Sequence, residues 1–257
     1  MTEKTNVENT LPLLFVHGSF ANANSWRKII DCLPDHFDCH SVNLPGHGGM
    51  ADSDDFDSPT FKPEFDILKS ALENIPNTEH GIHLIGHSYG GVVALAAAMD
   101  NALPIKKLTL FEPVDVAVLN VFSQTNTLNI IRGFRDEYNQ ALAISDALAC
   151  SKVIDFWGGA GSFDAVPAHI QTAMTTMTKN NIRHWVLCTE NGREIEHYKN
   201  LDIPVTFING SRSHDVAKKI SSTLNNNLPN SNLYLIDNAS HFMITSHAED
   251  CAKILQT

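Results

Sequence analysis

Five consecutive residues, Gly86-His87-Ser88-Tyr89-Gly90, have the form G-x-S-x-G. An apolar run precedes them and an apolar helical pattern follows, so a strand, a tight turn and a helix are expected around the serine. Glycines permit such a turn where larger side chains would collide, and a helix N-terminus favours developing negative charge. Because the turn holds the hydroxyl clear of the backbone, Ser88 is the candidate nucleophile.

A serine hydroxyl attacks slowly until a base takes its proton, so a histidine held by a carboxylate should accompany Ser88. Among the thirteen histidines, His241 is the best candidate, because it lies in a loop just after the last predicted strand. Four others lie among polar residues and are expected at the surface: His40, His80, His184 and His197. His83 and His87 are spaced like helical metal ligands, but they occupy a strand and its turn, so no metal site is expected.

Short apolar runs alternate with helical patterns along most of the chain. Strands are expected over residues 11–16, 37–42, 82–85, 105–111, 203–209 and 233–236. Helices are expected over residues 26–33, 64–75, 92–99, 216–224 and 248–255. This alternation predicts an α/β fold with a mainly parallel sheet.

Residues 116–198 break this alternation with a long and largely helical pattern. We expect a helical cap inserted into a single domain, whose core comprises residues 11–115 and 199–257. The aromatic side chains of this segment either line a pocket or pack the interior of the cap; they are Phe122, Phe134, Phe156, Trp157, Phe163 and Trp185. Trp157 is followed by Gly-Gly-Ala-Gly, which is either a hinge or an ordinary loop.

Four stretches together resemble the α/β-hydrolase family, over nearly the whole chain from Leu11 to Leu255. The stretch LFVHGSF from Leu14 is similar to the family's first long strand and HG loop. The stretch NLPGHG from Asn43 is similar to its D-x-P-G-x-G turn, with Asn43 in place of the usual Asp. The stretches IGHSYGG from Ile85 and NASHF, which contains His241, are similar to its nucleophile elbow and histidine loop. The resemblance implies a mainly parallel sheet flanked by helices, with a helical cap.

The resemblance also implies which groups surround the serine. The oxyanion hole would be formed by the backbone N–H groups of Ser19 and Tyr89, and backbone donors suit this task because they are fixed before the charge appears. Gly18 lets the chain approach the pocket closely, and Phe20 either covers the pocket or packs in the core. Trp157 is expected to line the pocket. No cofactor is implied.

The carboxylate of the triad does not follow the common pattern. The family usually carries its acid after the penultimate strand, in a G-x-x-D pattern, and this chain has Ser213 at that place. Glu112 stands at the end of the strand that follows the nucleophile helix, where some family members carry the acid instead. A carboxylate in a hydrophobic run is costly unless it has a partner. We therefore expect the triad Ser88, His241 and Glu112.

Three alternatives remain open for these carboxylates. Asp215 lies two residues beyond Ser213 and would serve if the loop is distorted, although it also suits the start of a helix. Asp115 is a lesser candidate because it lies three residues beyond the strand end. Glu112 itself would have only a structural role if it satisfies loop amides.

The net charge of the chain limits the classes of partner that it is expected to bind. The 257 residues include 18 Lys and Arg against 29 Asp and Glu, a net charge of −11, which argues against nucleic acid or an anionic membrane surface as a partner. Four of the acidic residues, at positions 52, 54, 55 and 57, form a run that is expected to be a solvated loop. A small-molecule substrate is therefore expected.

Cysteine usage and the N-terminus both bear on location. The five cysteines are an odd number without a CxxC pair, so free thiols and a reducing compartment are expected. Residues 1–10 are polar, unlike a signal peptide, and no apolar run approaches the ~20 residues of a membrane span. We expect a cytoplasmic protein.

A serine nucleophile with this machinery favours acyl transfer to water. Esters are the favoured substrates, through an acyl-enzyme intermediate that water then hydrolyses. Two alternatives stay open. The same triad serves other chemistry, as in thioesterases, C–C hydrolases, lyases or perhydrolases. A ligand-binding protein that hydrolyses slowly or not at all would also retain the serine turn.

Overall fold

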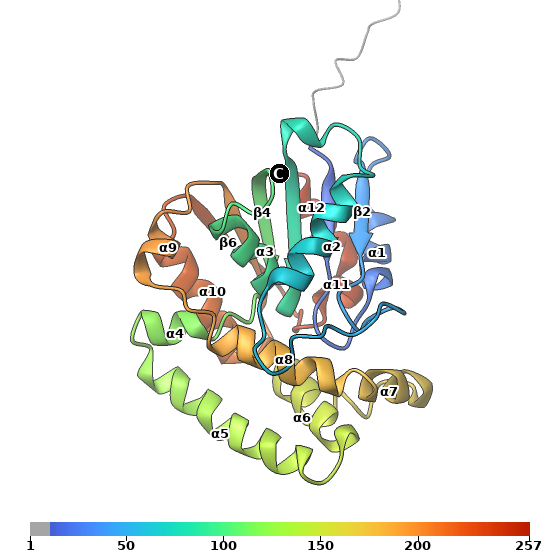
Figure 1. Ribbon diagram of the computed structural model, residues 1–257, viewed down its shortest axis with the longest axis vertical. Helices are drawn as coiled ribbons and strands as arrows, with labels where there is room; N and C mark the ends of the chain where they lie inside the picture. Colours follow the sequence, from blue (N-terminus) through green and yellow to red (C-terminus); the bar gives the residue numbers. More distant parts are fainter. Residues whose placement is uncertain (1–10) are drawn as a thin grey trace, which may run out of the picture.

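The computed structural model describes residues 11–257, and a six-stranded sheet lies at its centre (Figure 1). The order is β2-β1-β3-β4-β5-β6, and every neighbouring pair is parallel. The strands are β1 (Leu13–Val16), β2 (Cys39–Val42), β3 (Ile82–His87), β4 (Ile105–Phe111), β5 (Val205–Gly210) and β6 (Ser231–Ile236). The α/β fold with a mainly parallel sheet is thus confirmed. The polar segment 1–10, which was expected not to be a signal peptide, lies outside the described residues.

Helices cover both faces of the sheet, because successive residues of each buried strand face opposite sides. In β1, Leu14 and Val16 pack in the cluster that contains Val93, whereas Leu13 and Phe15 pack in the cluster that contains Leu255. The helices of the core are η1 (Ala23–Trp26), α1 (Arg27–Ile30), α2 (Lys62–Leu72), η2 (Thr78–His80), α3 (Tyr89–Met99), α10 (Asp215–Asn227), α11 (Met243–Ser246) and α12 (Ala248–Leu255). β1 and β3, in the interior of the sheet, are buried on both sides, which explains why their sequences are apolar runs rather than alternating patterns.

Between β4 and β5 the described chain forms only helices, which we call the helical segment. They are α4 (Ala117–Val121), α5 (Thr125–Leu142), α6 (Asp146–Gly158), α7 (Ala168–Thr175), α8 (Thr178–Thr189) and α9 (Ile195–Lys199). Figure 1 shows α5 to α8 beyond the carboxyl ends of the strands, with α8 between the sheet and α5. No helix in residues 11–257 combines the length and apolar composition that a membrane crossing requires.

The helix expected over residues 26–33 is much shorter than predicted. A 3₁₀ turn begins after Asn22, whose side chain accepts the Asn24 N–H, and the α-helical part ends at Ile30. After Ile30 the chain continues in tighter turns, in which the N–H groups of Cys32 and Leu33 donate to the carbonyls of Ile29 and Ile30, and Pro34 has no N–H with which to extend the helix.

Candidate active site

Ser88 lies in the turn between β3 and α3 in an unusual backbone conformation. Its φ of 55° and ψ of −120° belong to a region that residues other than glycine rarely adopt. Gly86 and Gly90 make the turn possible. A Cβ on Gly86 would lie 2.4 Å from the Gly90 carbonyl oxygen, and one on Gly90 would lie 2.3 Å from the Val16 carbonyl oxygen. The glycines therefore let β1, β3 and α3 approach closely around the serine.

His241 and Glu112 form a buried hydrogen-bonded pair. His241 Nδ1 lies 2.7 Å from Glu112 Oε2, and Glu112 Oε1 accepts the backbone N–H of Gly210 at 2.8 Å. The two side chains are 4% and 0% exposed, respectively. A carboxylate this deeply buried is costly unless its oxygens are paired, and here both oxygens are. With Nδ1–H donated to Glu112, Nε2 of His241 is left to act as a base.

Neighbouring rings hold His241 in place. Nε2–H of His87 donates to the His241 carbonyl at 2.8 Å, and the Trp157 indole stacks on His241 at 5.7 Å between ring centroids. Burial, together with His241, lowers the pKa of His87 to about 3, so the His87 ring is neutral. Within residues 11–257, no hydrogen bond joins Ser88 Oγ to His241 Nε2, although both side chains line one cavity. Such bonds are often long without substrate and tighten when it binds.

Asp215, the alternative acid, lies away from His241. It is the first residue of α10, its side chain is 90% exposed, and its carboxylate lies 2.9 Å from Lys218 Nζ. Asp215 therefore supports the start of a helix, and it does not contact the buried imidazole.

Asp115 and Ser213 do not contact His241 either. Asp115 is buried and accepts hydrogen bonds from Tyr198 and Asn191, which lie near the other end of the helical segment. Ser213 is buried after β5, and its hydroxyl has no partner among the described residues. Of the carboxylates weighed from the sequence, the structure brings only Glu112 to His241.

The backbone beside Ser88 offers two hydrogen-bond donors. In the described part of the chain, neither the Ser19 N–H nor the Tyr89 N–H donates to another backbone group. His17 fixes the loop before Ser19, since its Nδ1–H donates to the Gly18 carbonyl at 2.8 Å and its Nε2 accepts the Leu44 N–H at 3.0 Å. A Cβ on Gly18 would lie 2.9 Å from Ser88 Cβ, so only glycine allows this approach.

A cavity of about 50 Å³ opens next to Ser88, with room for only a few water-sized groups. Its lining residues are Ser19, Phe20, His87, Ser88, Val114, Val153, Ile154, Trp157, Asn181, His184, Trp185, Cys188, His241 and Phe242. Phe20 both lines the cavity and belongs to the core, so its two expected roles coincide. Gly18 was expected in the pocket but is not among these lining residues, and it packs against Ser88 instead.

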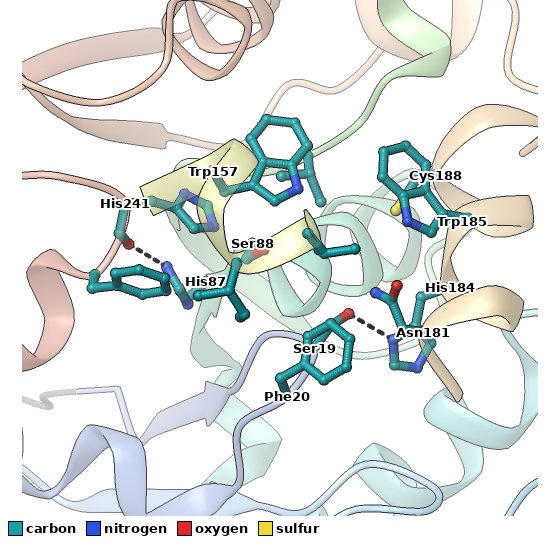
Figure 2. A pocket seen from close by; sticks show the side chains of 14 residues that line it. Ser19, Phe20, His87, Ser88, Trp157, Asn181, His184, Trp185, Cys188 and His241 are labelled. Atoms are coloured by element: carbon teal, nitrogen blue, oxygen red, sulfur yellow. Dashed lines mark hydrogen bonds between the residues drawn. The ribbon is translucent and has the colours of Figure 1, made fainter. Parts of the chain in front are cut away.

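The helical segment supplies two walls of this cavity. Val153, Ile154 and Trp157 come from α6 and make one wall apolar. Helix α8 supplies Asn181, His184, Trp185 and Cys188, whose spacing of i, i+3, i+4 and i+7 places them on one helix face. Figure 2 shows Ser88 between the His241 and Trp157 side and the α8 side.

The expectation that His184 lies at the surface is wrong. His184 is 2% exposed, its ring stacks on Tyr89 at 3.6 Å between centroids, and its Nδ1 lies 2.7 Å from Ser19 Oγ. The polar neighbours of His184 in the sequence misled the prediction, because they too are buried: Asn181 shares the cavity face of α8, and Asn180 and Arg183 bind acidic side chains of the core. The helical spacing of Asn181, His184, Trp185 and Cys188 is the signal that would have revealed the wall.

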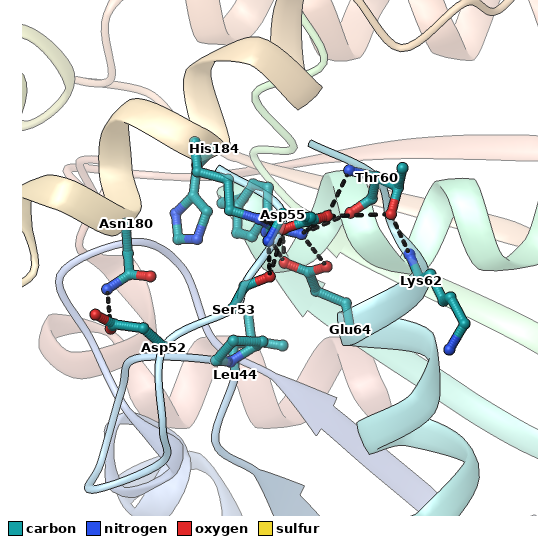
Figure 3. A network of polar contacts seen from close by, with 12 residues as sticks. Leu44, Asp52, Ser53, Asp55, Thr60, Lys62, Glu64, Asn180 and His184 are labelled. Carbon is teal, nitrogen blue, oxygen red and sulfur yellow. Dashed lines mark hydrogen bonds and ion pairs between the residues drawn. The ribbon is translucent and has the colours of Figure 1, made fainter. Parts of the chain in front are cut away.

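The acidic run is not simply a solvated loop, because two of its members, Asp52 and Asp55, bind side chains of α8. Asp55 Oδ1 lies 2.6 Å from Nε of Arg183, whose NH1 and NH2 groups donate to Glu64 of α2. The Arg183 side chain is 1% exposed and that of Glu64 is 0% exposed. Asp52 accepts a hydrogen bond from Asn180 at 3.0 Å. Figure 3 shows this network, which joins α8 to the loop before α2.

Tyr89 connects this network to the serine turn. Its hydroxyl donates to Glu64 Oε1 at 2.6 Å, while its backbone N–H lies at the start of α3. Burial, reinforced by the Glu64 carboxylate, raises the pKa of Tyr89 well above its usual value, so the hydroxyl stays protonated. Burial opposes the charge on Arg183, but its hydrogen bonds with Asp55 and Glu64 raise its pKa overall.

Cys188 also lines the cavity and carries a potentially nucleophilic sulfur. Burial, with a smaller effect of Asp115, raises its pKa well above the usual value for a thiol. A buried neutral thiol reacts poorly, because the thiolate is the nucleophilic form. Ser88 therefore remains the candidate nucleophile of this cavity.

Comparison with known proteins gives this fold a family context. A model of the alpha/beta hydrolase family matches residues 13–254. A putative 2-succinyl-6-hydroxy-2,4-cyclohexadiene-1-carboxylate synthase of Haemophilus influenzae is 35% identical over 95 residues, which cover 35% of this chain and 35% of that protein. A pimeloyl-[acyl-carrier protein] methyl ester esterase of Neisseria meningitidis serogroup B is 23% identical over 250 residues, covering 93% of this chain and 89% of the esterase.

A solved structure shows the same fold over almost the full length. MenH from S. aureus superposes with a TM-score of 0.74 and 19% sequence identity, covering 98% of this chain and 94% of that one. At this identity the likeness shows a shared fold.

Proposed function

The chain belongs to the alpha/beta hydrolase family, whose model spans nearly all of it, and from this premise we propose that it is a serine hydrolase. Its substrate is a small molecule with an ester-type bond, and the reaction passes through an acyl-enzyme. The observation that carries the proposal is the hydrogen bond of 2.7 Å between His241 Nδ1 and Glu112 Oε2, at the cavity that Ser88 lines. The similarity to a named ester esterase supports this choice of bond.

In the acylation step, Ser88 Oγ attacks the substrate carbonyl carbon while His241 Nε2 takes the hydroxyl proton. The Ser19 and Tyr89 N–H groups donate to the oxyanion as it forms. His241 then gives its proton to the leaving alcohol oxygen, the C–O bond breaks, and the acyl group stays on Ser88.

Deacylation repeats this cycle with water. His241 Nε2 takes a proton from the water, whose oxygen attacks the acyl carbon. Collapse of the second oxyanion returns the proton to Ser88 Oγ and releases the acid. Glu112 holds the imidazole in one tautomer throughout and stabilises its protonated form.

The proposal includes a role for the helical segment and a location. The segment acts as a cap that selects substrates, which is supported by the walls that α6 and α8 contribute to the cavity. We also propose that the protein works in the cytoplasm, and its five free cysteines support a reducing compartment.

Labelling with a fluorophosphonate, followed by a screen of p-nitrophenyl esters of increasing acyl length, tests the function. We expect Ser88 to be labelled and short acyl esters to turn over, and Ser88→Ala to abolish both. A wild-type protein that neither labels nor hydrolyses any ester would favour the non-catalytic alternative. Thioester substrates in the same screen separate a thioesterase from an esterase.

A second experiment moves the carboxylate from position 112 to position 213 and tests whether Glu112 is the acid of the triad. We expect Glu112→Gln to lose turnover and the double variant Glu112→Gln/Ser213→Asp to recover part of it. Ser213 is suited to this exchange because it is buried in the loop directly after β5, whose last residue, Gly210, binds Glu112. The variant Ser213→Asp alone is the matched control. Full activity of Glu112→Gln would remove Glu112 from the triad.

A further inference from the structure

The side of the cavity formed by Ser19 and α8 carries polar groups that the proposed acyl transfer does not use. Ser19 Oγ and His184 Nδ1 lie 2.7 Å apart, and both residues line the cavity with Ser88. In the proposed reaction Ser19 contributes only its backbone N–H. The hydroxyl of Ser19 and the imidazole of His184 are therefore available for another purpose.

The Ser19 and His184 pair can both donate and accept hydrogen bonds. Burial first, and then the neighbouring His47 and Arg183, lower the pKa of His184 well below its usual value, so its ring is neutral. If Nδ1–H donates to Ser19 Oγ, the serine hydroxyl proton is free for a ligand. If the serine donates to Nδ1 instead, its oxygen lone pairs are free to accept.

Asn181 adds a fixed amide one turn earlier on α8. It is 5% exposed, and its Oδ1 accepts the hydroxyl of Tyr138 at 2.9 Å. No hydrogen bond to another described residue uses its Nδ2 group, and the residue lines the cavity. The bond from Tyr138 fixes the orientation of the amide, which leaves its N–H donors for a ligand.

This polar wall carries no positive charge. Neither Lys nor Arg is among the cavity-lining residues of the described chain. The nearest guanidinium on α8, that of Arg183, is 1% exposed and is already bound by Asp55 and Glu64. An anionic group at this wall would lose its hydration without gaining a counter-charge. The wall therefore suits an uncharged group.

The facing wall differs in chemistry. Val153, Ile154 and Trp157 of α6 offer only apolar surface apart from the Trp157 indole nitrogen. Figure 2 shows Trp157 on one side of Ser88 and Ser19, Asn181 and His184 on the other. A substrate whose scissile carbonyl lies at Ser88 would therefore meet apolar side chains in one direction and hydrogen-bonding groups in the other.

We propose that Ser19, Asn181 and His184 form a polar subsite for an uncharged hydrogen-bonding group of the substrate, such as an ether, hydroxyl, keto or amide group within a few bonds of the scissile carbonyl. The subsite rests on the proposed serine hydrolase function. It makes the preferred substrate an oxygenated or amide-bearing neutral ester rather than a plain alkyl ester or a carboxylate.

Matched substrates test the subsite. On the acyl side, p-nitrophenyl butyrate is compared with p-nitrophenyl methoxyacetate, in which an ether oxygen replaces one methylene group. On the alcohol side, butyl acetate is compared with 2-methoxyethyl acetate. The polar-to-apolar ratio of kcat/KM is measured in wild type and variants, so that the intrinsic reactivity of each ester cancels.

The variants are Ser19→Ala, Asn181→Ala and His184→Phe, and the control is Asn180→Ala. Asn180 and Asn181 are adjacent buried asparagines of α8, but Asn180 binds Asp52 and does not line the cavity. Loss of one hydrogen bond should lower the polar-to-apolar ratio of kcat/KM by about 5- to 10-fold for at least one substrate pair. The control should keep the wild-type ratio within about twofold.

A charged substrate provides the second arm. Ethyl hydrogen succinate, whose carboxylate is ionised at neutral pH, should be hydrolysed with a kcat/KM at least about tenfold below that of ethyl butyrate. Equal rates for these two esters, or unchanged ratios in all three variants for both substrate pairs, would overturn the subsite.

Fluorophosphonate labelling of Ser88 counts the active sites in each variant, so loss of folding is not mistaken for loss of the subsite. A wild-type protein that labels and hydrolyses esters while the ratios stay unchanged refutes the subsite alone. A wild-type protein that does neither refutes the serine hydrolase function on which the subsite rests.

Discussion

Two glutamates among residues 11–257 are completely buried, and their partners give them different roles. The carboxylate of Glu112 pairs with the His241 imidazole and accepts the Gly210 backbone N–H, beside the cavity that Ser88 lines. Glu64 binds the guanidinium of Arg183 and the hydroxyl of Tyr89, at the junction between α8 and the core. Each side chain is 0% exposed.

The difference between these regions lies in what the partner can do with a proton. An imidazole changes its protonation near neutral pH and can pass a proton to a substrate, whereas a guanidinium stays charged throughout. Burial alone therefore does not identify a catalytic carboxylate. The pair at His241 suits proton transfer, and the pair at Arg183 suits permanent attachment of a helix.

The largest effect on kcat is expected when the hydrogen bond between Glu112 and His241 is broken. Glu112→Gln should lower kcat about 10³- to 10⁴-fold, because His241 loses the acceptor that sets its tautomer and stabilises its charged form. Its cost in free energy of unfolding should be smaller than that of breaking the Arg183 pair. Initial rates on an ester and urea unfolding measure the two quantities. A kcat within tenfold of wild type would contradict the assignment.

Breaking the ion pair between Glu64 and Arg183 should mainly lower the free energy of unfolding. Arg183→Met leaves Glu64 buried without its cation, and removal of one partner from a buried pair typically costs about 3–5 kcal/mol. Urea unfolding measures this loss. The double variant Arg183→Met/Glu64→Met removes both charges and should regain much of it. If Arg183→Met unfolds like wild type, the network does not anchor α8.

A third buried carboxylate, Asp115, sharpens the comparison because its hydrogen-bond partners Tyr198 and Asn191 are uncharged. Burial raises its pKa to about 6 despite these bonds. The folded chain therefore holds this proton more tightly than the unfolded chain, and the contribution of Asp115 to stability is lost as pH rises from about 4 through 6.

Asp115→Asn should remove that pH dependence. Relative to wild type, the variant should gain up to about 2–3 kcal/mol between pH 4 and pH 8, because the asparagine never has to ionise in the buried site. Unfolding free energies of both proteins at the two pH values provide the measurement. A constant difference between the two proteins would show that Asp115 keeps an ordinary pKa in the folded state.

The smallest effect is expected at Asp215, an exposed carboxylate that pairs with Lys218. Asp215→Asn should change kcat by less than about twofold and leave the midpoint of urea unfolding nearly unchanged, as is usual for exposed ion pairs. The same ester assay and urea unfolding apply. A loss of turnover comparable to that of Glu112→Gln would make Asp215 the acid and reverse the assignment.

The sequence was informative where local rules act. The apolar runs predicted the strands, and the glycines at positions 86 and 90 indicated the tight turn that the structure shows around Ser88. The helix expected over residues 26–33 was too long, because apolar spacing does not distinguish an α-helix from the tighter turns that the chain forms between Ile30 and Pro34.

The surroundings of the serine were less accessible to prediction. His184 and the acidic run were both judged from their polar neighbours in the sequence. His184 proved to be buried, and the acidic run, although largely exposed, binds α8 through Asp52 and Asp55. Residues 52–55 and 180–184 are more than one hundred positions apart, yet Asn180 donates a hydrogen bond to Asp52 and Arg183 forms an ion pair with Asp55 at the junction of α8 with the core. Polarity along the chain cannot reveal such a partner.

The sequence by itself determined the fold class, the family and the candidate nucleophile, because strand periodicity, glycine spacing and turn chemistry depend on neighbours within a few residues. Only the tertiary structure decided which carboxylate meets His241, and which face of α8 lines the cavity. Those outcomes depend on how distant elements meet, since a buried polar side chain must be satisfied by whatever group the packing brings to it.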